Sequence, residues 1–144
     1  MAALNQADPL SIDIWAGLIN PAGLAFLSHR GTGLFYGNRF LLPEMNLGAV
    51  VVAYPLDKSA MSGGLTFDGF SLFYEAMPWL AYGRKFSTTL AGGLSMAYRY
   101  VQIGEGYGRY GFMEASLGLA WEALPDLYMG FRLSNPWARP GRTA

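Results

Sequence analysis

Between residues 90 and 133 the chain repeats one pattern three times, with large apolar side chains alternating with small or charged ones. The large positions of the three runs are Leu90, Leu94, Met96, Tyr98; Met113, Leu117, Leu119, Trp121; and Leu127, Met129, Phe131, Leu133. The positions between them are mainly Gly, Ala and Ser, with isolated charges. A period of two places successive side chains on opposite faces of a strand. One large apolar face and one small, polar face are typical of the wall of a transmembrane β-barrel.

The same pattern, punctuated by turn residues, predicts an all-β fold with about seven strands in antiparallel meander order. The predicted strands are residues 33–40, 47–54, 63–73, 79–86, 90–103, 110–123 and 127–135. Short links separate them, among them Met77-Pro78. Several of these strands are long enough for a membrane span, which needs about 9–11 residues. Because single-chain bacterial barrels have an even number of strands, seven favours the first half of a longer barrel.

The two ends of the chain depart from this pattern. Residues 1–29 contain Asp8-Pro9 and Asn20-Pro21, which break regular structure, yet they are too apolar for a free tail. We expect one helical turn near residues 11–18 and a chain reversal at Asn20-Pro21-Ala22-Gly23. Residues 30–136 carry the strands, and residues 137–144 form an irregular tail because Pro and Gly interrupt them.

Composition narrows the class of protein. Charged residues make up 14% of the chain, against about 25% in an ordinary soluble domain. No run of about 18 apolar residues occurs, so no transmembrane helix is expected. The zero net charge and scattered basic residues argue against a nucleic-acid partner. The absence of Cys excludes disulfides and thiolate metal sites.

Four charged residues fall on the small-residue face of the last three predicted strands: Arg99, Glu114, Glu122 and Arg132. A charge facing the barrel interior is tolerated, whereas on the lipid face it costs about 2–4 kcal/mol at the midplane. Two interpretations are open. The charges hold a plug or line a transport route, or they are simply solvated or paired in a polar interior.

Aromatic side chains gather towards the predicted strand ends, where amphipathic rings favour the level of the lipid headgroups. They are Tyr98, Tyr100, Tyr107, Tyr110, Phe112, Trp121, Tyr128 and Trp137. Aromatic rings also fill soluble cores, so this pattern supports a membrane wall without deciding it.

The sequence predicts no enzyme, no cofactor and no metal site. His29 is the only histidine and has no recognisable nucleophile setting around it. Glu114 and Glu122 are eight positions apart on one predicted strand, which separates them by about 27 Å. Paired acid–base catalysis needs carboxylates much closer than that. No cluster of residues has metal-ligand spacing.

The segment Asn20-Pro21-Ala22-Gly23-Leu24 resembles the N-terminal plug of FadL-type outer-membrane barrels, including the PorV/PorQ branch. Further stretches are similar to that family: Phe35-Tyr36-Gly37-Asn38-Arg39-Phe40-Leu41-Leu42-Pro43-Glu44, Tyr74-Glu75, Ala81-Tyr82-Gly83-Arg84-Lys85, Ala91-Gly92-Gly93-Leu94 and Gly130 to Asn135-Pro136. The family barrel has fourteen strands, so the resemblance implies half of such a barrel, with residues 1–29 as its plug. It also implies the outer membrane of a Gram-negative bacterium. The expected export signal and the final aromatic-ended strand have no match here, which favours a fragment of a longer reading frame.

The resemblance implies a non-enzymatic role, structural or carrier-like, in type IX protein secretion or surface attachment. Its partners would be outer-membrane lipid and secretion-system proteins or exported cargo. An alternative is FadL-like transport of long-chain fatty acids or other hydrophobic small molecules. A third hypothesis, from another class, is a soluble lipid-binding β-barrel. A homodimer of two seven-stranded halves is a further way to close a barrel.

Overall fold

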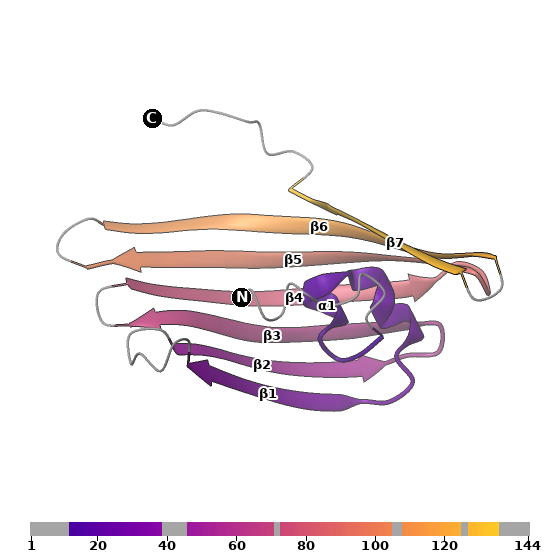
Figure 1. The fold of residues 1–144 in the computed structure, drawn as a ribbon, viewed down its shortest axis with the longest axis horizontal. Helices are drawn as coiled ribbons and strands as arrows, with labels where there is room; N and C mark the ends of the chain where they lie inside the picture. The colour runs from indigo at the N-terminus through magenta and orange to yellow at the C-terminus, as the bar shows by residue number, and fades with distance from the viewer. Residues whose placement is uncertain (1–11, 39–45, 71–72, 105–107, 125–126, 136–144) are drawn as a thin grey trace.

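The computed structural model describes residues 12–38, 46–70, 73–104, 108–124 and 127–135. Its seven strands form one antiparallel sheet in which every neighbour in the sheet is a neighbour in sequence (Figure 1). The strands are β1 Gly31–Asn38, β2 Asn46–Pro55, β3 Ser59–Phe70, β4 Phe73–Lys85, β5 Leu90–Ile103, β6 Gly108–Leu124 and β7 Leu127–Ser134. The predicted all-β meander of seven strands is therefore confirmed. Within the described residues the sheet is open, with β1 and β7 at its two edges.

One predicted link is wrong. Met77-Pro78 lies inside β4, and the connection from β3 to β4 falls at residues 71–72, outside the described residues. Proline lacks the N–H that a central strand needs, which is why the sequence suggested a break. The sheet accommodates Pro78 by omitting ladder pairs. Pairing between β4 and β5 stops at Ala76–Tyr100 and resumes at Trp79–Ala97.

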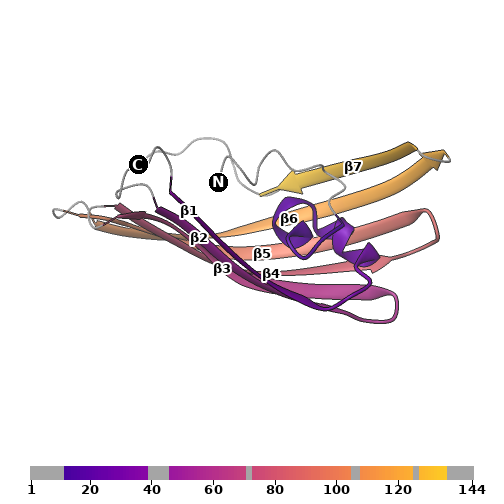
Figure 2. The ribbon, with the colours of Figure 1, turned by 60° about the horizontal axis from the view of Figure 1, so that its bottom comes forward.

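The sheet is curved, and the N-terminal segment lies on its concave side (Figure 2). This segment contains a short helix α1 (Ala16–Ile19) and a 3₁₀ helix η1 (Pro21–Phe26). It lies near the end of the sheet where the β2–β3 and β4–β5 turns are found, here called the tight-turn end (Figure 1). The predicted helical turn thus lies later than expected, and the predicted reversal at Asn20 begins η1. Asn20 caps that helix and Pro21 presets its first φ angle.

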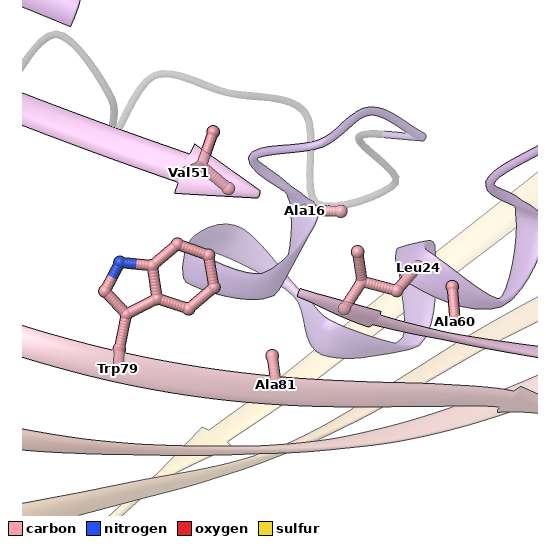
Figure 3. Packing of buried hydrophobic residues seen from close by; sticks show 6 residues of the cluster. All are labelled: Ala16, Leu24, Val51, Ala60, Trp79 and Ala81. Carbon is pink, nitrogen blue, oxygen red and sulfur yellow. The ribbon is translucent and has the colours of Figure 1, made fainter. Parts of the chain in front are cut away.

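The core lies between the N-terminal segment and the concave face. One buried cluster consists of Ala16, Leu24, Val51, Ala60, Trp79 and Ala81 (Figure 3). A second consists of Ala22, Ala25, Ala91 and Ala120, with Phe26 packed against it. Alanine makes up half of the first cluster and all of the second, so the backbone of the segment approaches the sheet closely. None of the helices in the described part of the chain is long and apolar enough to cross a bilayer.

Candidate functional site

A row of glycines on the concave face receives the N-terminal segment. Gly83, Gly93 and Gly118 are direct register partners on β4, β5 and β6. A Cβ at Gly93 would overlap the backbone of Pro21 and Ala22, and one at Gly118 would lie 2.9 Å from Pro21 Cδ. Only glycine therefore allows η1 to rest directly on the sheet. The small-residue face predicted from the alternation is the face against which the segment packs.

Asn20 ties the segment to the last two strands. Its side chain is fully buried, and its Oδ1 accepts a hydrogen bond of 3.1 Å from Ala22 N, which caps η1. Its Nδ2 donates to the carbonyl oxygens of Leu119, at 3.3 Å, and Phe131, at 3.4 Å. Leu119 and Phe131 are register partners on β6 and β7. One amide thus joins the beginning of a helix to the junction of two strands about a hundred residues later in the chain.

Arg132 on β7 caps the end of α1. Its Nη1 donates to the carbonyl oxygens of Leu18, at 2.6 Å, and Ile19, at 2.9 Å. Its Nη2 donates to Ser116 Oγ at 3.1 Å. The last carbonyls of a helix have no partner within the helix, and a cation there is favourable. Asn20 and Arg132 together are here called the clamp.

Arg99 forms a charge cluster on the same concave face. Its Nε donates to Glu114 Oε1 at 2.6 Å and its Nη2 to Glu114 Oε2 at 3.2 Å, a bidentate pair. Its Nη1 pairs with Glu75 on β4. All three side chains are only about one-fifth to one-quarter exposed. The Arg99 guanidinium also lies 6.0 Å from the centroid of the Phe112 ring.

A cavity of about 210 Å³ separates the charge cluster from the clamp. Arg99, Glu114, Ser116 and Arg132 line it from the sheet together with apolar residues, among them Met77 and Trp79, and residues 17–19 line it from the N-terminal segment. Of the four charges singled out from the sequence, the structure brings three to this cavity. Glu122 lies eight residues beyond Glu114 on β6 and is not among the residues that line the cavity.

The convex face is apolar and exposed. Leu80 in the middle of β4 is 68% exposed, and Val52 on β2 is 56% exposed. The face continues across the sheet through Leu34, Val50, Tyr54, Met61, Leu65, Tyr82, Leu94, Met96, Tyr98, Leu117, Leu119, Phe131 and Leu133. These residues are here called the apolar band. By the alternation of the strands, the charged residues that the described part places on this face are Arg84 and Arg109, at opposite ends of the band.

Aromatic side chains lie at both ends of the apolar band. Tyr54, Tyr82 and Trp121 are exposed near the tight-turn end. Tyr36, Tyr74 and Tyr98 are exposed towards the opposite end. Phe112, near the start of β6, lies on the concave face beside Arg99 and is therefore not part of the apolar band. Tyr107 and Trp137 are outside the described residues, as is the side chain of Tyr128.

Sequence reasoning missed Glu75, the glycine row and the long-range bonds of Asn20. Glu75 could have been found by extending the alternation through Pro78. In that register it shares a face with Trp79 and Ala81. The glycine row depends on which strands pair and in which register, information that the local pattern does not contain.

In comparisons with protein-family models, with curated proteins and with solved structures, this chain has no match. Among the described residues, no group of three or more His, Cys, Asp or Glu side chains could hold a metal ion.

Proposed function

We propose that this chain forms part of the wall of a transmembrane β-barrel in the outer membrane of a Gram-negative bacterium. The N-terminal segment lies inside the barrel as its plug. The apolar band carries this proposal, because exposed apolar patches on soluble monomers rarely exceed a few hundred Å². A barrel wall has this polarity, with its apolar face towards lipid and its polar face towards the lumen.

The dimensions of the apolar band support a bilayer environment. Arg84 is the register partner of Gly92, and Gly92 is the partner of Leu119. Leu119 is ten positions from Arg109 on β6, which corresponds to about 33 Å along the strand. A strand tilted by about 40° then spans about 25 Å of thickness, the height of the apolar band in outer-membrane barrels. The aromatic residues at both ends fit the two interfacial girdles of such a wall.

The open edges require closure. Unpaired backbone groups at a lipid-exposed sheet edge are not tolerated within a bilayer. In the proposed protein, β1 and β7 therefore pair with further strands, and the resemblance to FadL-type proteins suggests a total of fourteen.

For the role of the barrel we propose the PorV/PorQ type, a structural or carrier function in type IX protein secretion or surface attachment. Three charged side chains in the lining of the 210 Å³ cavity favour this role over passage of a hydrophobic molecule. Arg99, Glu114 and Arg132 lie there beside apolar residues such as Met77 and Trp79, and an acyl chain would remove these charges from water at considerable cost. A soluble lipid-binding barrel would need the reverse arrangement, with an apolar interior and a polar exterior.

Deleting the coding sequence in its own bacterium tests this role directly. We expect cargo proteins to be lost from the cell surface, with uptake of a long-chain fatty acid such as oleate unchanged. Re-expression of the intact protein should restore cargo display. Normal cargo display together with reduced oleate uptake would overturn the secretion role in favour of transport.

A further inference from the structure

A groove of about 590 Å³ crosses the convex face over β5, β6 and β7 near the tight-turn end. Its apolar lining consists of Phe86, Gly92, Leu117, Leu119, Phe131 and Leu133. The groove depends on Gly92, because any side chain there would fill its floor. Even a Cβ at Gly92 would lie 2.6 Å from Cε2 of the Phe86 ring.

Basic residues border this groove on its tight-turn side. Arg84 is the register partner of Gly92 and lies on the same convex face by the alternation of β4. Lys58 lines a second depression, of about 460 Å³, together with Ser87 and Thr88. Lys85 also lines it, but its ammonium lies 4.9 Å from the centroid of the Phe26 ring, on the concave side of the sheet. The two depressions share Phe86. Neither Arg84 nor Asp57, which precedes Lys58 in the turn, is part of either lining; Arg84 lies beside the groove as the register partner of Gly92.

We propose that this groove and its basic border form a binding site for one anionic phospholipid, an inference that rests on the proposed membrane function. The acyl chain lies in the groove, and the phosphate is bound by Arg84, with Lys58 and the Ser87 and Thr88 hydroxyls nearby. Arginine suits a phosphate because its planar guanidinium donates two parallel hydrogen bonds.

Two further features place the headgroup at the tight-turn end. Trp121, two positions from Leu119 on β6, is 44% exposed at the level typical of the membrane interface. No connection at this end is longer than four residues, whereas the β1–β2 connection at the opposite end, residues 39–45, has seven; the end with the shorter connections is typically the periplasmic side of outer-membrane barrels. The site therefore selects a phospholipid of the periplasmic leaflet.

Retention of phospholipid by the purified chain tests this site. The purified chain in non-ionic detergent is incubated with equal amounts of phosphatidylglycerol and phosphatidylcholine and analysed by native mass spectrometry. We expect one phosphatidylglycerol retained in preference to phosphatidylcholine. Arg84→Gln should lower this preference about fivefold, the effect of one basic residue at an anionic membrane surface. Arg109→Gln, at the other end of the apolar band, is the matched control and should retain the preference.

The groove itself is tested by Gly92→Leu, which should abolish retention of both lipids, and by the milder Gly92→Ala, which should weaken it. Val50→Leu, which enlarges an exposed side chain on the same face of β2 but outside the groove, should behave as the unaltered protein. Equal retention of the two lipids by the unaltered protein, or equal behaviour of Arg84→Gln and Arg109→Gln, would overturn the lipid site alone. A protein that remains dispersed in buffer without detergent would overturn the membrane proposal as well.

Discussion

At the scale of single residues, Asn20 has the largest structural reach, because one buried amide caps η1 and bonds to both β6 and β7. Arg132 adds a second connection from β7 to the same segment. The hydrogen bonds of this clamp therefore connect the N-terminal segment to β6 and β7, the last two strands in the sequence. The apolar contacts of the segment reach β2, β3 and β4 as well, through Val51, Ala60 and Trp79.

Substitutions at Asn20 separate its two tasks. Asn20→Ser keeps a capping oxygen but loses the donor to Leu119 and Phe131, so we expect the free energy of unfolding to fall by about 1–3 kcal/mol. Asn20→Ala also removes the capping oxygen, which should lower the free energy of unfolding by about 1 kcal/mol more. Denaturant unfolding in detergent, followed by tryptophan fluorescence, measures both. If Asn20→Ser were as stable as the unaltered protein, the bonds to β6 and β7 would have no structural role.

Adjacent glycines on β5 provide a matched pair of positions. Gly93 faces η1 and Gly92 faces the opposite side of the sheet. Gly93→Ala should displace the N-terminal segment or cost about 1–3 kcal/mol through overpacking. We therefore expect faster tryptic cleavage at Arg30, which is exposed just before β1, in Gly93→Ala than in Gly92→Ala. Equal cleavage rates in the two variants would show that the glycine row does not control the docking of the segment.

At the scale of elements, the alternation of β4 assigns Leu80 to the middle of the apolar band, whereas Leu124 ends β6 near the turn to β7. If the band faces lipid, Leu80→Lys should destabilise the folded protein in vesicles by about 2–4 kcal/mol. Leu124→Lys, closer to the interface, should cost about 0–1 kcal/mol. Equilibrium unfolding in lipid vesicles gives both values. A neutral or stabilising Leu80→Lys would indicate that this face meets water.

The strands also show how much of the fold can be predicted from the sequence. The period of two predicted seven strands, and the bounds of β5 agree with the structure, because alternation is a local property of the chain. Pro78 misled the prediction, since a local break signal cannot reveal that the neighbouring ladder omits two pairs. The glycine row and the Arg99–Glu75–Glu114 cluster depend on register across strands. Those contacts follow from tertiary structure alone.

At the scale of the whole molecule, the dominant feature is the pair of open edges. The ladder between β6 and β7 covers Ser116 to Leu124, the second half of β6, and β7 is the last strand of the described sheet. Long unpaired edges promote pairing with another chain. We expect the 144-residue chain, expressed alone, to associate into dimers or larger species in detergent. Sedimentation equilibrium showing a single monomeric species would contradict this expectation.

The central claim is that the convex face contacts lipid. Because the chain contains no cysteine, single cysteines can be introduced on this face at Leu80, Met96 and Leu117, and at Asp57 in the β2–β3 turn as the exposed control. In lipid vesicles, a water-soluble maleimide should label Asp57→Cys, while the three band positions react only with a membrane-soluble maleimide. Rapid labelling of Leu80→Cys, Met96→Cys and Leu117→Cys by the water-soluble reagent, at the rate of Asp57→Cys, would contradict the account.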